Sequence, residues 1–194
     1  MIDISAYSSL PALTGIFNSV IITPVYSDNF QIIRMPKRNY WVFMTRSDDY
    51  SDPNNRVYSD DNLLYLTEYC KELLNIDFNS ILIAGLGLGN IPYQIKNHSS
   101  CSIIDVIDNN QEIINLTMSA GYLDGVSIIN EDVFNYIPTK TYDIILLDIW
   151  LCAGCIDNME VQISTLVTKY LSFLNEGGFV YVPINVNSNS IFKN

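Results

Sequence analysis

The sequence predicts an α/β protein built on an open, mostly parallel β-sheet. From residue 60 onward, short apolar runs of strand length alternate with helical patterns, as repeated βαβ units require. A glycine-rich turn follows the first of these strands and opens a helix. The 194 residues are 48% hydrophobic, which is enough for a buried core in a chain of this length.

The elements follow from the period of the apolar residues. The predicted strands are Ser80–Ala84, Ser102–Ile107, Val126–Ile129, Tyr142–Leu147 and Phe179–Val182. The predicted helices are Ile91–Lys96, Gln111–Ala120, Val161–Leu174 and one that begins near Leu63 behind an N-cap at Ser59 or Asp60. We expect right-handed crossover connections and the strand order 3-2-1-4-5.

Residues 1–58 follow a different pattern. Three short β-rich runs, at Val20–Ile22, Gln31–Met35 and Tyr40–Met44, alternate with turn residues, and a polar stretch at Ser47–Asn55 follows them. The sequence therefore predicts a small N-terminal β-hairpin unit with a linker over 1–58, and a second domain over 59–194.

The net charge of the chain limits the classes of ligand that it is expected to bind. Ten Lys and Arg residues against 21 Asp and Glu give a formal charge of −11 and an isoelectric point near 4.2. Because such a chain repels phosphate backbones, we expect no nucleic-acid partner and favour a small neutral or cationic substrate.

Location and metal content are also predicted. No apolar run approaches the ~20 residues that cross a bilayer, and Met1–Ser5 lacks the basic start of a signal peptide. We therefore expect a cytoplasmic protein with reduced thiols and no membrane contact. With His98 as the lone histidine, no metal site is expected. Cys152 and Cys155 form a C-x-x-C, which is compatible with a redox pair, half a zinc site or packed thiols.

The glycine segment is the most specific signal. The run Ile81–Ala84 leads directly into Gly85, Gly87 and Gly89, and a helical pattern follows at once. Glycines permit unusual backbone angles and close approach of a ligand, and the N–H groups that open a helix favour an anion or carboxylate.

Two cofactors compete for this segment. Dinucleotide sites use G-x-G-x-x-G to admit a pyrophosphate, whereas this chain has G-x-G-x-G with Asn90 in place of the third glycine. The spacing resembles the S-adenosylmethionine loop of class I methyltransferase-like folds. We therefore favour S-adenosylmethionine or its decarboxylated relative over NAD, with a turn that binds no ligand as the remaining alternative.

Three acids follow predicted strands. Asp108 can accept hydrogen bonds from both hydroxyls of a ribose, or it can cap the helix near Gln111. Asp132 can accept from an adenine amino group while the Val133 N–H donates, or it is a solvated acid in a turn. Asp148 follows the fourth strand, where it can remove a proton from a nucleophile, hold an amine or stabilise a sulfonium, or else cap a helix or pair with a cation.

Between roughly Phe30 and Ile184 the sequence resembles the spermidine synthase-like branch of the class I methyltransferase fold. The motifs that carry the resemblance are Asn29–Ile33, Gly85/Gly87/Gly89, Asp108 with Glu112–Ile114, Asp132 with Phe134, Tyr142–Asp148 and Leu174–Gly178. The resemblance implies a Rossmann-like class I methyltransferase fold that is C-terminally truncated, since the chain stops about ten residues after the fifth strand. It also implies nucleoside binding by Gln31, the glycine loop, Asp108 and Asp132, with Asp148 at the catalytic position.

Departures from that family shape the functional prediction. Polyamine-making members carry acids where this chain has Leu88 and Leu151, and a Tyr-Gln pair where it has Leu63–Leu64. Since leucine cannot hold an ammonium group, the sequence favours a small-molecule methyltransferase. The alternatives are a binding or assembly module without catalysis, forming a homo-oligomer through its hairpins, and a genuine polyamine aminopropyltransferase.

Overall fold

The structure, a computed structural model, describes residues 24–34, 41–46, 57–60, 73–149, 159–183 and 189–193. The chain divides into two compact units, one formed by residues 1–76, 87–99 and 115–124, the other by residues 77–86, 100–114 and 125–194. The domain boundary predicted after residue 58 stays a prediction. The predicted strand at 20–22 and the start of the helix near Leu63 lie outside the described residues. No helix in the described ranges has the length and apolar character needed to cross a bilayer.

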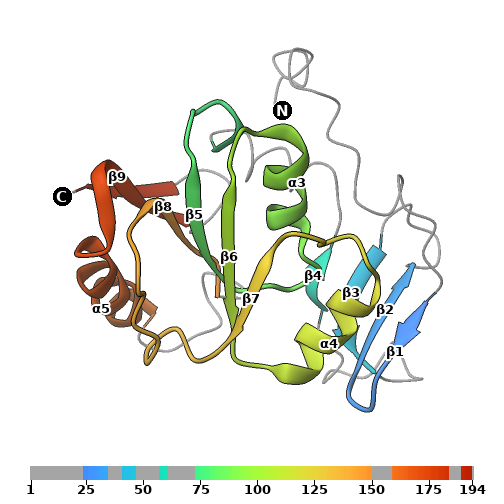
Figure 1. Cartoon of the computed structure of the whole chain (residues 1–194). Coiled ribbons are helices and arrows are strands. Elements are labelled where there is room, and N and C mark those ends of the chain that lie inside the picture. The colour runs from blue at the N-terminus through green and yellow to red at the C-terminus, as the bar shows by residue number, and fades with distance from the viewer. Residues whose placement is uncertain are drawn as a thin grey trace, which may run out of the picture. The chain divides into compact units, whose positions relative to one another are not determined.

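The second unit contains a six-stranded sheet in the order β10-β9-β8-β5-β6-β7 (Figure 1). The strands are β5 (Ser80–Ala84), β6 (Ile103–Asp108), β7 (Ser127–Asn130), β8 (Tyr142–Leu147), β9 (Leu174–Pro183) and β10 (Asn189–Lys193). The first five pair in parallel, so the predicted order 3-2-1-4-5 and the Rossmann-like α/β fold are confirmed. β10, which was not predicted, adds an antiparallel edge strand beside β9.

Helix α5 (Met159–Leu171) covers part of this sheet with an apolar stripe. Its buried residues recur at helical spacing and pack in one core with side chains of the strands. These helix residues are Ile163, Leu166, Val167 and Tyr170. The helix ends before Leu174, which the sequence placed at its end, because Leu174 pairs with Tyr142 of β8 and begins β9. The Tyr142 N–H also donates to the Phe173 carbonyl, at 2.9 Å.

The first unit contains an antiparallel sheet in the order β1-β2-β3-β4. Its strands are β1 (Val25–Tyr26), β2 (Phe30–Arg34), β3 (Trp41–Thr45) and β4 (Val57–Asp60). The β2–β3 pairing confirms the predicted hairpin. Ser59 and Asp60, one of which is predicted to cap the helix near Leu63, belong to β4 and pair with Phe43 and Val42 of β3. The start of that helix lies outside the described residues, so the cap stays a prediction. Helix α3 (Asn90–His98) belongs to this unit, and α4 (Gln111–Ser119) begins in the second unit and ends in the first.

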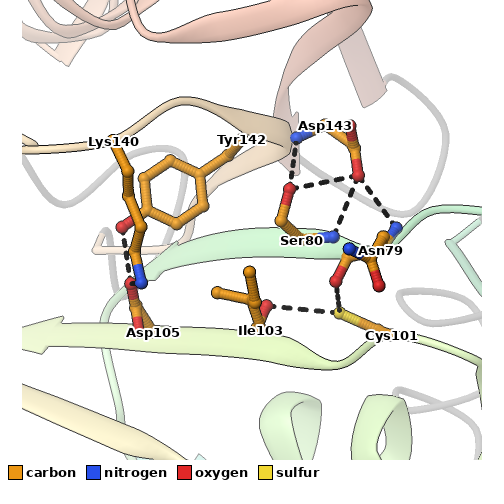
Figure 2. A network of polar contacts seen from close by, with 8 residues as sticks. All are labelled: Asn79, Ser80, Cys101, Ile103, Asp105, Lys140, Tyr142 and Asp143. Carbon is orange, nitrogen blue, oxygen red and sulfur yellow. Dashed lines mark hydrogen bonds and ion pairs between the residues drawn. The ribbon is translucent and has the colours of Figure 1, made fainter.

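Hydrogen bonds of polar side chains connect the amino ends of the parallel strands (Figure 2). The Asp143 carboxylate accepts hydrogen bonds from the N–H groups of Asn79 and Ser80, at 2.8 and 2.9 Å, and from the Ser80 hydroxyl. Its other oxygen accepts from the Asn175 amide, at 2.7 Å. These bonds join β8 to the start of β5 and to β9, so the sheet is fixed at the edge where its parallel strands begin.

Candidate active site

The glycine segment after β5 has the unusual backbone that the sequence predicts. Gly85, Gly87 and Gly89 have φ angles of 100°, 50° and 71°, in the left-handed region that side chains other than glycine rarely adopt.

Gly85 also lies against the backbone that follows β8. Its N–H donates to the Ile107 carbonyl, at 2.8 Å. A Cβ atom at this position would lie 2.1 Å from the Asp148 carbonyl oxygen, and no real contact is that short. Position 85 therefore needs glycine for two independent reasons, its backbone angle and this close approach.

Asp108 contacts the same segment through its side chain. Oδ2 accepts from the Leu86 N–H, at 3.0 Å, and Oδ1 accepts from the Asn110 N–H, at 2.9 Å. The Asn110 side chain caps α4, because its Oδ1 accepts from the N–H groups of Glu112 and Ile113. Since each carboxylate oxygen has two lone pairs, both Asp108 oxygens retain capacity for a ligand hydroxyl.

Asp132 opens the turn after β7. Its Oδ1 accepts from the Phe134 N–H, at 2.9 Å, and its carbonyl accepts from the N–H groups of Asn135 and Tyr136, each at 2.8 Å. Val133 is buried, whereas the Phe134 side chain is 39% exposed. The turn thus carries a half-buried acid, followed two residues later by an exposed aromatic side chain.

Asp148 directly follows β8. Its N–H donates to the Ala84 carbonyl, at 2.9 Å, which extends the β5–β8 ladder by one residue. Burial raises the pKa of the Asp148 carboxyl to about 7. A carboxyl group that titrates near neutrality can exchange a proton with a substrate at physiological pH.

The strand order brings these acids to one edge. In the sequence β8-β5-β6-β7, every strand is parallel to its neighbours and ends at the same side of the sheet. Asp148, Gly85, Asp108 and Asp132 therefore follow one another along this edge. Ligands of open α/β sheets bind outside the carboxyl ends of the strands, which makes this edge the candidate active site.

The rest of the glycine segment belongs to the first unit. Gly89 is the N-cap of α3, with no side-chain cap, and a Cβ there would lie 2.7 Å from Leu123 Cδ1. The Leu88 side chain is fully buried, and its carbonyl accepts from the Tyr122 hydroxyl. The Thr117 hydroxyl donates to the Gly87 carbonyl, at 2.8 Å. The segment is thus fixed by its own protein contacts.

Gln31, the remaining predicted nucleoside-binding residue, lies in β2 of the first unit. Its side chain is 4% exposed and its amide Nε2 donates to the Thr45 carbonyl, at 3.2 Å. Its role in ligand binding stays a prediction. Leu151, Cys152 and Cys155 lie outside the described residues.

The sequence did not predict the contacts of three polar groups in the second unit. Asp105, in the middle of β6, accepts from the Tyr142 hydroxyl and from Lys140, at 2.5 and 2.8 Å (Figure 2). Asp143 holds the amino ends of the strands, and Lys169 of α5 contacts the turn after β7. The only signal in the sequence is a charged residue next to apolar neighbours, which does not show what the charge contacts.

Comparison with known proteins gives similarity of structure alone. No protein-family model matches the sequence, and no curated protein matches it significantly. Among solved structures, coclaurine N-methyltransferase bound to N-methylheliamine and SAH is 19% identical, with a TM-score of 0.49 over 63% of this chain and 34% of that one.

Two further solved structures give similar values. The N-methyltransferase NodS from Bradyrhizobium japonicum WM9, in complex with S-adenosyl-L-homocysteine, is 15% identical, with a TM-score of 0.49 over 63% of this chain and 60% of that one. The DhpI–SAH complex is 19% identical, with a TM-score of 0.49 over 63% and 56%. This chain thus spans less than two thirds of the length of each of the three.

Proposed function

We propose that this protein binds S-adenosylmethionine at the carboxyl edge of the parallel sheet and transfers its methyl group to a small molecule. The observation that carries the proposal is the position of Asp108, whose carboxylate accepts the Leu86 N–H beside Gly85. A carboxylate held against a glycine turn at the end of the neighbouring strand fits the two hydroxyls of a ribose.

The other groups at this edge fit the rest of the ligand. Asp132 and the Val133 N–H supply an acceptor and a donor for adenine. Binding of the methionine carboxylate at the helix that follows Gly89 stays a prediction of the sequence, because that helix belongs to the first unit. S-adenosylmethionine supplies an electrophilic methyl group when bound, and its positive sulfonium suits an edge with three acids.

Asp148 is the proposed general base. When a nitrogen or oxygen nucleophile forms its bond to the methyl carbon and the carbon–sulfur bond breaks, the nucleophile must lose a proton. An ionised Asp148 accepts that proton, and a pKa of about 7 keeps a large share of the group ionised at neutral pH. The ionised form also stabilises the sulfonium before transfer.

Leu88 supports methyl transfer over aminopropyl transfer. Aminopropyl transfer needs acids that hold a polyamine, and Leu88, which occupies one such position in the family, is fully buried in the first unit. An acid introduced there would be a buried charge and would destabilise the fold. Decarboxylated S-adenosylmethionine also lacks the carboxylate that the N–H groups at the start of a helix favour, so we expect it to bind less tightly.

Calorimetry tests the proposal. We expect the wild-type protein to bind S-adenosylmethionine and S-adenosylhomocysteine, and NADH not at all. Asp108→Asn should weaken both ligands by about 1.5–3 kcal/mol, because hydrogen bonds from the ribose to a charged carboxylate are lost. Glu176→Gln, which removes an exposed acid far along the chain, is the matched control and should change neither affinity.

The outcomes separate the alternatives. Binding of NADH without binding of either adenosyl compound overturns the proposal. Tight binding with no methyl transfer to amines or hydroxyls of a small-molecule panel leaves a binding or assembly module. Spermidine formation from putrescine and decarboxylated S-adenosylmethionine would establish aminopropyl transfer. A homo-oligomer through the hairpins and a cytoplasmic location stay predictions of the sequence.

A further inference from the structure

We propose that Lys169 and Tyr170 of α5 are positioning residues that set the base selectivity of this site. The inference rests on the proposed function, because it concerns the turn whose Asp132 and Val133 would bind adenine. Both side chains donate hydrogen bonds to backbone carbonyls of that turn.

The contacts fall on the carbonyls of Val133, Phe134 and Tyr136, and two of them share the Val133 carbonyl. Lys169 Nζ donates to the carbonyls of Val133 and Phe134, at 3.1 and 2.8 Å. The Tyr170 hydroxyl donates to the same Val133 carbonyl, at 2.9 Å. The Val133 carbonyl therefore accepts two hydrogen bonds from adjacent residues of a helix that packs in the core.

The peptide unit of the Val133 carbonyl also holds the Asp132 carboxylate. A peptide group is planar, so the Val133 carbonyl and the Phe134 N–H point in opposite directions from one rigid plane. The Phe134 N–H donates to Asp132 Oδ1, at 2.9 Å. Fixing the carbonyl from α5 thus fixes the direction of the N–H, and with it the orientation of the carboxylate.

Burial and charge are consistent with a role in orientation. Tyr170 is fully buried, and its ring lies 5.3 Å from Lys169 Nζ. Burial lowers the pKa of Lys169, and the nearby negative charge of Asp132 opposes that shift. The ammonium group is thus close enough to Asp132 to influence it electrostatically, while its hydrogen bonds go to the backbone.

The consequence is selectivity for adenine over hypoxanthine. Adenine offers an amino group to Asp132 and an acceptor nitrogen to the Val133 N–H. Hypoxanthine offers a carbonyl oxygen and an N–H at the same two places, so a fixed turn rejects it with two mismatched pairs. A turn released from α5 can reorient, and it then discriminates less between the two bases.

The test measures the affinities of S-adenosylhomocysteine and S-inosylhomocysteine by calorimetry in Lys169→Met and Tyr170→Phe. We expect the ratio of the two affinities to fall by about three- to tenfold in each variant, the effect of one or two hydrogen bonds. Lys169→Arg should restore most of the ratio. Lys193→Met makes the same chemical change at an exposed lysine and should leave the ratio unchanged.

A second readout is amide hydrogen exchange at Phe134, which should accelerate in Lys169→Met without ligand. Equal losses for both ligands, or a ratio that stays at the wild-type value, would refute the positioning role and leave the proposed function intact. If the wild-type protein binds neither ligand, the proposed function fails and the selectivity role fails with it.

Discussion

Asp143 and Asp148 lie at opposite ends of β8, and the pKa values of their carboxyl groups are shifted in opposite directions. Burial alone would raise the pKa of Asp143, but hydrogen bonds from Asn175, Asn79 and Ser80 outweigh it and lower the pKa. For Asp148 the cause of the shift is burial, which raises its pKa to about 7. One acid is held ionised by its neighbours, whereas the other titrates near neutral pH.

The two ends of the sheet also differ in how these acids are held. At the amino end, the Asp143 carboxylate accepts two backbone N–H groups and two side-chain donors. At the carboxyl edge, the Asp148 backbone completes the ladder with Ala84, and its carboxyl group remains able to change protonation state. The Asp143 end of β8 is thus held by hydrogen bonds, whereas the Asp148 end carries the carboxyl group whose pKa is raised.

The largest loss of stability is expected at Gly85, at the carboxyl edge of the sheet. Gly85→Ala should destabilise the protein by about 4 kcal/mol or prevent folding, because its Cβ would overlap the Asp148 carbonyl and its φ is +100°. Gly125→Ala is the matched control, since φ is +83° and no atom lies within 4 Å of the added Cβ. We expect it to cost about 1–2 kcal/mol in urea denaturation. Equal costs at both positions would contradict the close approach.

The second prediction tests the amino end. Asp143→Ala should lower the free energy of unfolding by about 2–3 kcal/mol, because two backbone N–H groups and the Asn175 amide lose their acceptor. Since the folded pKa of Asp143 is lowered, its contribution is present above the unfolded pKa and is lost as the pH falls. Asp124→Ala, at an exposed acid, is the control. A loss below about 0.5 kcal/mol in Asp143→Ala would show that the network does not stabilise the sheet.

The sequence predicted the parts of the fold that local patterns determine. β5 and β8 lie in the middle of the parallel sheet, and central strands consist of continuous apolar runs that are easily found. β4 and β10 were missed, because Val57–Asp60 and Asn189–Lys193 are mixed in polarity and become strands by pairing with β3 and β9. Pairing between distant segments is not visible in a local period.

The same distinction applies to the site. The three glycines of the loop were found from their spacing, and each has a positive φ. Asp143 was missed, because its partners Asn79 and Ser80 are 64 and 63 residues away in the chain. Lys169 was missed for the same reason, because the Val133 carbonyl is 36 residues away in the chain. Residues that act through long-range contacts need the structure to be recognised.

The smallest effect is expected at Asp148, and its sign is opposite to that at Asp143. Because the folded pKa of Asp148 is raised to about 7, the folded state holds a proton that the unfolded chain releases near pH 4, and stability falls as the pH rises between these values. Asp148→Asn removes this penalty, so its stability relative to the wild type should grow by about 1–2 kcal/mol from pH 6 to pH 8 in urea denaturation. Glu176→Gln, which changes an exposed acid, should show no such trend. A difference that is flat with pH, or one that shrinks toward pH 8, would mean that Asp148 is an ordinary ionised acid and that the two ends of β8 do not differ.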